Sequence, residues 1–333
     1  MRTRAIVFEK RNRVVLQDIE MPDPKPGEAR VKTEFSTVSV GTEGWILQDL
    51  FTWVPTPYPC VSGYQRMGTI TALGDGVEGW RIGERVVATG GSWEGAVGAW
   101  QGAHAAVGNI AVSDNTLFRI PEGVDPVDAS ALVVAQVGYN AASRVACAPR
   151  DWAVVFGDGI IGQSAAQAAR ARGMKVVLIG HRPERLALAA QYSADVVVNS
   201  HEQAAPEAVR EITGRDHVRA VLDSVQGESV QSEYMALLEH ARGQIVYCGF
   251  TPNPTWADMG LLQQHEFTTH FVSGWAPERM RATLALMAQG KMSVRPLITH
   301  MVPFDQGPEM YRMVLGKDQP FTGITFDWRG EKS

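Results

Sequence analysis

The sequence predicts an α/β protein in two parts, an N-terminal all-β domain followed by a doubly wound parallel sheet. Residues 1 to about 130 contain short apolar runs separated by glycine and proline turns, a pattern typical of β-strands. From Asp151 to about Gly290, strand and helix patterns alternate, which indicates a parallel sheet covered by helices. A glycine-rich motif lies between the first strand and the first helix of this second region.

Each element rests on a local pattern of apolar and turn-forming residues. The second region opens with an apolar strand at 152–156, an alanine-rich helix at 163–172 and a valine-rich strand at 175–179. We expect residues 1–136 together with 291–333 to form one domain, and residues 137–290 to form the other. The remaining expected elements are strands at 4–8, 14–19, 28–39, 67–73, 85–89, 220–222, 243–248, 266–272 and 323–327, and a helical stretch at 126–148.

The glycine-rich motif spans residues 157–162, with the sequence GDGIIG. Between a strand and a helix, its glycines provide a tight turn, a close approach of backbone to pyrophosphate, and helix-on-strand packing. The pyrophosphate would rest on the N–H groups at the helix N-terminus, where the helix dipole favours an anion. A glycine-rich turn without a ligand is the alternative, but the strand–helix–strand context favours a dinucleotide. The glycines are Gly157, Gly159 and Gly162, with Ile160 and Ile161 between them.

The end of the second strand indicates which dinucleotide binds. Enzymes that use NAD carry an acidic residue about 20 residues beyond the first glycine, where it binds the ribose 2′-hydroxyl. This chain has Gly180 there, followed by His181, Arg182 and, one helical turn later, Arg185. A guanidinium can bind a 2′-phosphate through charge-assisted hydrogen bonds, so we expect NADP. The alternative for Arg182 is a solvated residue at a helix start.

Composition excludes several other classes of protein. The net charge is −5 and no basic stripe with aromatic residues occurs, which argues against nucleic-acid or anionic-membrane binding. No apolar run is long enough to span a membrane, and the N-terminus has no signal-peptide pattern. The three cysteines are widely spaced, which suits reduced thiols in the cytoplasm. We therefore expect a cytoplasmic enzyme that acts on a small molecule.

Several short segments, in this order, resemble the medium-chain dehydrogenase/reductase superfamily over nearly the whole chain. Residues 41–43 (GTE) are similar to the CGTD turn of its zinc alcohol dehydrogenases, and residues 63–65 (GYQ) stand where their GHE motif falls. Residues 80–86 and the PLITH segment at 296–300 also match. The resemblance implies a GroES-like β domain, a Rossmann domain and oxidoreductase activity. It also implies a homodimer joined through the edge strand at 266–272.

The chain departs from that family at its zinc ligands. The first ligand cysteine aligns with Val40, the histidine of GHE with Tyr64, and the third ligand with Ala135 or Gln136. Zinc prefers cysteine, histidine or carboxylate ligands, so we expect neither the catalytic zinc nor, because residues 90–102 hold no cysteine, the structural zinc. A different metal held by Glu43, His104 and Gln136 is the less favoured alternative.

Without zinc, protein side chains must handle the proton that accompanies hydride transfer. Thr42 aligns with the proton-relay hydroxyl of the family, and the Tyr64 phenol could hydrogen-bond a substrate oxygen. His104 could serve as general acid and base, with Glu43 beside it. The structural alternatives are a packed histidine, a core tyrosine, and a Glu43 that pairs with Arg66 or Arg85.

The sequence favours an oxidoreductase that interconverts a ketone and a secondary alcohol. We expect it to use NADPH and to work without zinc. Aromatic residues flank the expected site, which suits a ring-shaped, polyol- or cyclitol-like substrate. Reduction of an activated C=C or C=N bond is the alternative, and a non-enzymatic NADP-binding protein is the third hypothesis. The expected substrate-pocket residues are Trp45, Trp53, Trp93 and Gln136, in loops that also carry Phe51 and Tyr58. The expected nicotinamide contacts are Ile161, Gly249, Phe250, Ser273 and Gly274.

Overall fold

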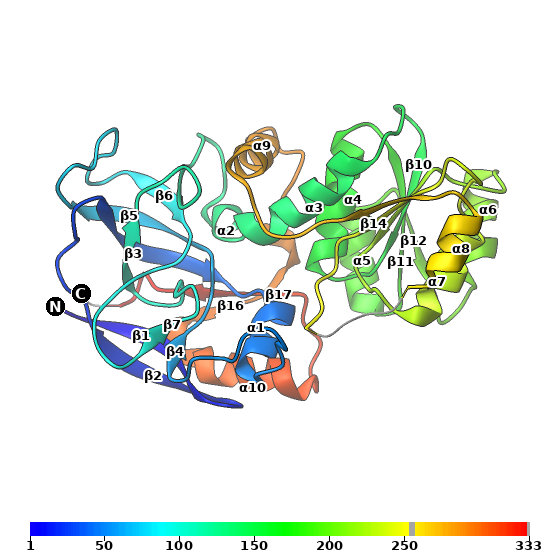
Figure 1. The fold of residues 1–333 in the computed structure, drawn as a ribbon. Coiled ribbons are helices and arrows are strands. Elements are labelled where there is room, and N and C mark those ends of the chain that lie inside the picture. Colours follow the sequence, from blue (N-terminus) through cyan, green and yellow to red (C-terminus); the bar gives the residue numbers. More distant parts are fainter. Residues whose placement is uncertain (253–256, 332–333) are drawn as a thin grey trace. The chain divides into compact units, whose positions relative to one another are not determined.

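The computed structural model of the 333-residue chain describes residues 1–252 and 257–331 (Figure 1). The chain forms two compact units. Unit 1 consists of Met1–Val133, Ala276–Ala288 and Ile298–Ser333, and unit 2 consists of Val134–Trp275 and Gln289–Leu297. The expected α/β fold, with a β-rich part and an alternating part, is confirmed. Residues 276–288 group with unit 1, although the sequence-derived boundaries place them in the second domain.

Unit 1 is built on two β-sheets. Strand β3 (Glu28–Thr37) alternates buried and half-buried residues, so that one face of it points into the core. It pairs antiparallel with β5 (Arg66–Leu73) and with β17 (Gly323–Asp327), which brings the C-terminal strand beside an N-terminal one. The sheet orders are β2-β1-β4-β7 and β16-β17-β3-β5-β6-β9, with β8 also paired to β3. The other strands are β1 (Arg2–Lys10), β2 (Arg13–Glu20), β4 (Cys60–Val61), β6 (Arg85–Ala88), β7 (Gly98–Ala99), β8 (Val107–Ala111), β9 (Leu117–Arg119) and β16 (Ile298–Pro303).

Helices α1 (Val40–Leu47) and α10 (Gly307–Gly316) pack on a core made largely of aromatic and aliphatic side chains. Phe8 and Tyr311 meet edge to face in this core, with ring centroids 4.9 Å apart. The core therefore joins residues from the first strand, from α1 and from the C-terminal residues 310–328. The other helical segments of unit 1 are α2 (Pro126–Ser130), α9 (Pro277–Ala288) and the 3-10 turn η2 (Phe304–Gln306).

Unit 2 contains a parallel sheet of six strands in the order β12-β11-β10-β13-β14-β15. The order reverses between β10 and β13, which is the switch point of a doubly wound sheet. Its strands are β10 (Trp152–Phe156), β11 (Lys175–Gly180), β12 (Val196–Asn199), β13 (Ala220–Asp223), β14 (Gln244–Tyr247) and β15 (Thr268–Phe271). Its helices are α3 (Leu132–Arg144), α4 (Ile160–Ala171), α5 (Pro183–Tyr192), α6 (Ala205–Thr213), α7 (Glu228–Met235) and α8 (Met259–Gln264), with the 3-10 turn η1 (Arg295–Leu297).

Two elements differ from the sequence-based expectation for clear reasons. The helical stretch expected at 126–148 is two helices, because α2, capped by the Asp125 side chain, ends at Ser130 and α3 runs from Leu132 to Arg144. The edge strand expected at 266–272 begins only at Thr268, since Glu266 has a φ of +54°, which a strand does not allow.

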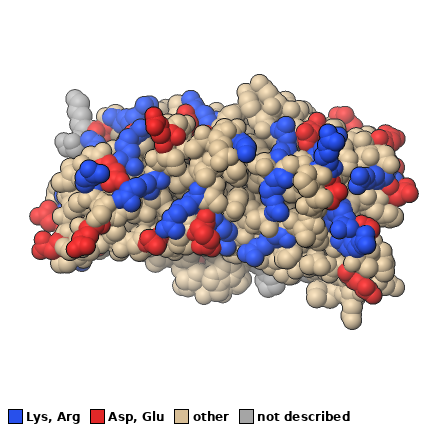
Figure 2. All heavy atoms as spheres, turned by 90° about the horizontal axis from the view of Figure 1, so that it is seen from above, with Lys and Arg blue, Asp and Glu red and all other residues tan. Residues whose placement is uncertain are grey.

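The surface charge and the lengths of the helices both bear on where the protein can bind. On the face drawn in Figure 2, basic and acidic side chains both occur across the surface. Within the described residues, we find no helix that is long and apolar enough to cross a membrane.

Candidate functional site

The glycine-rich turn joins β10 to α4 as the sequence predicts. Gly157 has a φ of +114°, and a Cβ there would lie 2.1 Å from Ser224 Oγ. A Cβ at Gly162 would lie 2.0 Å from the Gly157 carbonyl oxygen, so neither position tolerates a side chain. Gly159 is the N-cap of α4 and offers no capping side chain. The first turn of α4 therefore provides the backbone N–H groups and the dipole that suit a pyrophosphate.

The other expected cofactor residues of unit 2 lie at the same edge of the sheet. Gly249 and Phe250 follow β14, and Ser273 and Gly274 follow β15. The carboxyl ends of parallel strands meet at one edge, which is where the turn after β10 also stands. Gln136, from α3, is buried and donates from Nε2 to the Gly274 carbonyl at 2.7 Å. Its role within unit 2 is thus to hold the segment after β15.

A carboxylate from the turn after β10 stands beside the end of β11, where the sequence pattern predicts none. Asp158, the variable residue between the first two glycines, is buried, and a Cβ on Gly180 would lie 2.5 Å from its Cβ. Its Oδ2 accepts from the backbone N–H groups of His181 and Arg182, both at 3.0 Å. The inference from Gly180 that this corner lacks a carboxylate is therefore wrong, because Asp158 supplies one from the neighbouring strand.

Two guanidinium groups share the other oxygen of this carboxylate. Arg182 Nη1 and Arg185 Nη1 lie 3.2 and 3.4 Å from Asp158 Oδ1. Burial acts to raise the pKa of Asp158, but the two backbone N–H bonds and the two arginines outweigh it and hold the pKa below its usual value. Burial and the charge of Arg182 lower the pKa of His181. The corner thus combines two guanidinium groups with one ionised carboxylate. The two positive charges exceed the one negative charge, so the corner carries a net positive charge.

In unit 1, the candidate catalytic residues His104 and Glu43 are fully buried and bonded to each other. His104 Nε2 lies 2.9 Å from Glu43 Oε2, and His104 Nδ1 lies 2.8 Å from Ser36 Oγ. The Tyr311 hydroxyl also donates to Glu43 Oε2, and the Ser39 backbone N–H donates to Glu43 Oε1 at 2.7 Å. Both ring nitrogens of His104 are therefore occupied by protein groups.

The direction of these hydrogen bonds can be assigned from one fixed donor. Trp328 Nε1 donates to Ser36 Oγ at 2.8 Å, so the Ser36 hydroxyl proton is free to point at His104 Nδ1. His104 then carries its proton on Nε2 and donates it to Glu43. This assignment gives the Glu43 carboxyl group three donors, from His104, Tyr311 and the Ser39 backbone. A Cβ at Gly63 would lie 2.5 Å from the His104 ring, so that glycine makes room for the imidazole.

Tyr64 lies beside this network and is only half buried. Burial raises the pKa of its phenol, and the charge of Glu43 raises it further, while hydrogen bonding with Ser39 and Thr42 opposes this. Tyr64 is therefore protonated over the physiological range and able to donate a hydrogen bond. Gln65 is instead fully buried and structural: it donates to the Thr37 carbonyl at 3.1 Å and accepts from the Val133 N–H at 2.9 Å.

Neither sequence-based partner for Glu43 is correct. Arg85 pairs with Glu34 at 2.9 Å. Arg66 is buried and binds Thr33 Oγ1 and the carbonyl oxygens of Gly90, Gly102 and Ala105.

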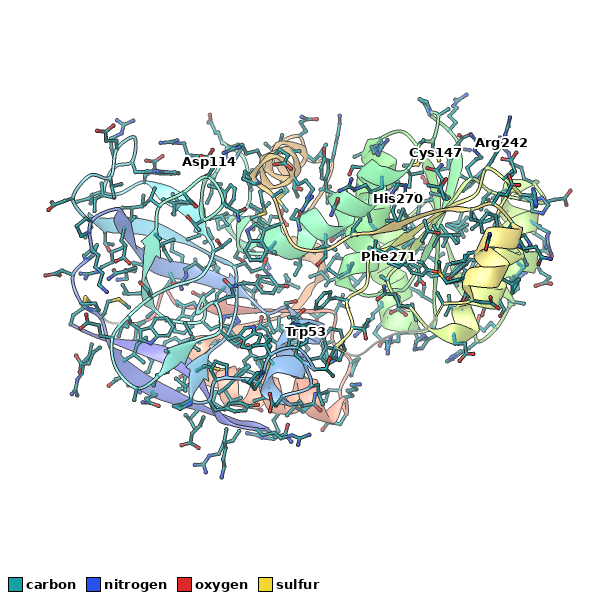
Figure 3. The ribbon with its side chains drawn as sticks, in the orientation of Figure 1. Trp53, Asp114, Cys147, Arg242, His270 and Phe271 are labelled. Atoms are coloured by element: carbon teal, nitrogen blue, oxygen red, sulfur yellow. The ribbon has the colours of Figure 1, made fainter. Side chains whose placement is uncertain are left out.

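The expected aromatic pocket residues belong to two separate groups. Phe51 stacks on Trp100 with centroids 6.0 Å apart and contacts Trp45 and Trp53 at 6.3 and 4.7 Å. Trp53, labelled in Figure 3, is 59% exposed, whereas Phe51 is buried. Trp93 instead packs on a different part of the core and donates to the Val97 carbonyl at 2.7 Å. Tyr58 donates to the carbonyls of Ile46 and Leu47 and holds the loop.

The positions that align with the family's zinc ligands carry few side chains that could bind a metal. In residues 1–252 and 257–331, no three His, Cys, Asp or Glu side chains gather as a metal site. His104 has both ring nitrogens hydrogen-bonded, and Val40, at the start of α1, has no ligating atom.

Comparison with known proteins places this fold in a family. Residues 25–122 match the alcohol dehydrogenase GroES-like domain, and residues 161–289 match the zinc-binding dehydrogenase domain. The chain belongs to the medium-chain dehydrogenase/reductase superfamily. It is 26% identical to a putative D-xylulose reductase of Agrobacterium fabrum, over 91% of this chain and 93% of that protein.

Two solved structures with a similar fold carry a bound dinucleotide. One is an alcohol dehydrogenase of Escherichia coli CFT073 complexed with NADH, with 21% identity, a TM-score of 0.83, and coverage of 98% of this chain and 99% of that one. The other is a putative zinc-binding dehydrogenase of Sinorhizobium meliloti bound to NADP, with 18% identity, a TM-score of 0.82 and the same coverage. The two likenesses establish the fold of this medium-chain dehydrogenase/reductase.

Proposed function

We propose that this protein is an NADPH-dependent, zinc-independent oxidoreductase that interconverts a ketone and a secondary alcohol. The observation that carries the proposal is a dinucleotide turn of the family pattern in a chain that has Tyr64, beside Thr42, in place of a zinc ligand. The D-xylulose reductase relative supports a polyol-like substrate. The aromatic cluster around Phe51 supports a ring-shaped one, such as a cyclitol.

When bound, the nicotinamide supplies or accepts the hydride. The protein must then supply a proton to the developing alkoxide. We assign this to the Tyr64 phenol, which donates a hydrogen bond to the substrate oxygen, with the Thr42 hydroxyl as the next group in the relay. Glu43 and His104 act as positioning residues, because the hydrogen bonds of His104 hold the Glu43 charge next to Tyr64.

Assay of the purified protein with NADPH against panels of ketones, activated enones and imines tests the proposal. Turnover of cyclic polyhydroxy ketones, with the reverse reaction on the matching alcohols, is the expected result. Turnover confined to enones or imines would contradict it, as would NADPH binding without turnover on any panel.

The first prediction is that NADPH binds at least tenfold more tightly than NADH, a difference of about 1.4 kcal/mol. The cause is the excess positive charge of Arg182 and Arg185 over Asp158. Fluorescence titration with both nucleotides measures it. Arg182→Ala should bring the two affinities within about threefold, whereas Asp158→Asn, which keeps an oxygen for the backbone N–H groups, should strengthen NADPH binding alone.

Arg242→Ala serves as the control for that titration, since its guanidinium lies in an exposed pair with Glu239. Equal affinity of the wild-type protein for both nucleotides would contradict the NADP assignment. Retention of the full preference by Arg182→Ala would show that another group binds the 2′-phosphate.

The second prediction concerns zinc. We expect less than about 0.1 equivalent of zinc per chain by elemental analysis, and activity that survives prolonged treatment with EDTA, because no competent ligand set is available at the family's positions. One equivalent of zinc, lost together with activity on chelation and restored with it, would refute the proposal.

The third prediction is a homodimer joined through the edge of the sheet in unit 2. β15 is the edge strand, and Phe271 on it is 73% exposed (Figure 3). An uncovered edge with a large apolar side chain favours pairing with a second copy across a two-fold axis. Light scattering at micromolar concentration should give twice the chain mass, and Phe271→Asp should shift it toward the monomer. A monomer mass for the wild-type protein would contradict this.

A further inference from the structure

Two histidine side chains stack on each other beside the corner around Asp158, at the carboxyl ends of β11 and β12. His181 follows β11 and His201 follows β12, and their ring centroids lie 4.9 Å apart with an angle of 27° between the planes. Both residues are exposed. The spacing from the glycine-rich turn predicts a cofactor contact near His181, whereas His201 lies outside that pattern.

The backbone fixes the place of His201. β11 pairs with β12 in parallel, and Gly180 lies opposite Asn199 where the two strands end. The Ser200 N–H donates to the Gly180 carbonyl at 2.8 Å, which continues the pairing beyond the strands. The His201 N–H donates to Asn199 Oδ1 at 3.1 Å and closes a turn. His201 is therefore held one residue beyond a contact with Gly180, which stands at the expected ribose position.

The charged groups that act on His181 come from three turns. Arg182 and Arg185 face it from the start of α5, and Asp158 faces it from the turn after β10. The third neighbour is His201, from the turn after β12. Burial is the first cause that lowers the pKa of His181, the charge of Arg182 is the second, and Asp158 opposes them. His181 is therefore mostly neutral at about pH 7 in the free protein.

Two more carboxylates belong to the same turns. Glu202 Oε1 accepts from Asn199 Nδ2 at 2.6 Å, and Glu184 acts on Arg185. Both carboxylates are exposed, so water and salt screen their charges. The two arginines and Asp158 therefore dominate the field at the histidine pair, and that field is positive.

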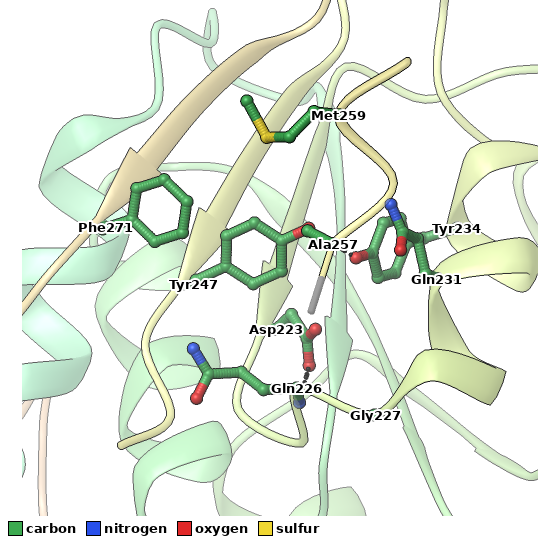
Figure 4. A pocket seen from close by; sticks show the side chains of 9 residues that line it. All are labelled: Asp223, Gln226, Gly227, Gln231, Tyr234, Tyr247, Ala257, Met259 and Phe271. Atoms are coloured by element: carbon green, nitrogen blue, oxygen red, sulfur yellow. Dashed lines mark hydrogen bonds between the residues drawn. The ribbon is translucent and has the colours of Figure 1, made fainter. Parts of the chain in front are cut away.

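A cavity elsewhere at the carboxyl edge of this sheet does not suit a phosphate. Figure 4 shows it at the ends of β13 and β14, with Asp223 and Tyr247 among its lining residues. None of the residues that line it is cationic. In the strand order, this cavity and the histidine pair lie on opposite sides of β10. A phosphate at this edge therefore finds its cations at the corner with the histidine pair.

A 2′-phosphate on Arg182 would reverse the effect of the surrounding charge on the two imidazoles. A phosphate monoester has a second pKa of about 6, so it carries nearly two negative charges at neutral pH. An opposite charge at close range raises the pKa of an imidazole by about 1 to 3. The pair would then take up a proton as the phosphate binds. The phosphate itself would release protons among cations, so a net uptake on binding comes from the protein.

We propose that His181 and His201 form a proton-linked part of the 2′-phosphate site and take up one shared proton when NADPH or NADP⁺ binds. The inference rests on the proposed use of NADPH and adds His201 to the residues that set the cofactor preference. Binding that takes up a proton weakens as pH rises. The preference for NADPH over NADH should therefore fall about threefold between about pH 6.5 and 8.

Calorimetric titration with NADP⁺ and with NAD⁺ at about pH 7 tests the proposal. Each titration is run in PIPES and in Tris buffer, whose different ionisation enthalpies reveal the number of protons exchanged on binding. NADP⁺ binding should take up about half a proton per chain, and binding of NAD⁺, which lacks the phosphate, less than about 0.1. Because the two rings share the proton, His201→Gln should lose about half of this uptake, and the double variant His181→Gln/His201→Gln should lose all of it.

His240→Gln is the matched control. His240 and His265 form a second histidine pair, with ring centroids 6.0 Å apart, ahead of β14 and β15. These positions are at the amino ends of the strands, away from the edge that binds a dinucleotide. The control should therefore keep the whole proton uptake.

Three results would overturn the proposal: equal proton uptake with NADP⁺ and NAD⁺, full uptake in the double variant, and full uptake in His201→Gln. Each of them leaves the preference for NADP⁺ in place. Equal affinity of the wild-type protein for NADP⁺ and NAD⁺ at every pH would instead refute the proposed cofactor, and this inference with it.

Discussion

Tyr64→Phe should lower turnover by about 100- to 10,000-fold, which is the usual cost of removing a general acid. The substitution removes one hydroxyl and keeps the ring, so that packing and NADPH affinity should change little. Steady-state kinetics of ketone reduction together with NADPH titration measure the two effects separately. Tyr58→Phe is the matched control, because its hydroxyl binds the Ile46 and Leu47 carbonyls rather than the network around Glu43, and it should keep at least half of the turnover.

A pH profile distinguishes the positioning role of Glu43 from a merely structural one. The Glu43 charge helps to raise the pKa of Tyr64, so Glu43→Gln should lower that pKa. Because the phenol must be protonated to donate, the loss of reductase activity at high pH should then begin at a lower pH than in the wild-type protein. If Tyr64→Phe kept more than about a third of wild-type turnover, the proton would have to come from Thr42 or water.

The fold follows from sequence where local pattern and tertiary environment agree. β10 and β17 lie at the predicted residues, because each is a short apolar run bounded by turn-forming residues and buried in its sheet. The same reasoning overestimates β15, since a local pattern does not reveal the left-handed conformation of Glu266. Local pattern likewise does not reveal that α9 groups with unit 1.

The candidate sites could be predicted only in part, because several of their contacts are distant in sequence. Tyr311 reaches Glu43 across 268 positions, and Trp328 reaches Ser36 across 292. No local sequence motif predicts either of these hydrogen bonds. The sequence does contain a signal for Asp158. An acidic residue inside the glycine-rich turn follows β10, and β10 pairs with β11, at whose end the residue that binds the ribose is expected. The glycine pattern leaves that position unspecified, so the pattern alone does not predict the role of the Asp158 carboxylate.

Arg66 holds the two ends of the segment 90–102, the place to which the family resemblance assigns a structural zinc. Its guanidinium binds the carbonyl oxygens of Gly90 and Gly102, one at each end of the segment, and also Thr33 and Ala105. Gly91 and Gly108 leave the space it needs, because a Cβ on either would lie within 2.8 Å of its nitrogens. Burial lowers the pKa of Arg66 to about 9, so the group stays charged at neutral pH.

Arg66→Met should therefore destabilise unit 1 by about 3–5 kcal/mol, since it removes a buried cation and its hydrogen bonds to the carbonyl oxygens of Gly90 and Gly102. Denaturant unfolding followed by tryptophan fluorescence measures this, with Trp93 and Trp100 reporting on the segment itself. Arg85→Met is the matched control on the neighbouring strand and should cost under about 1 kcal/mol, because its pair with Glu34 is half exposed. Equal losses for the two variants would show that the segment is held by its apolar packing rather than by the guanidinium.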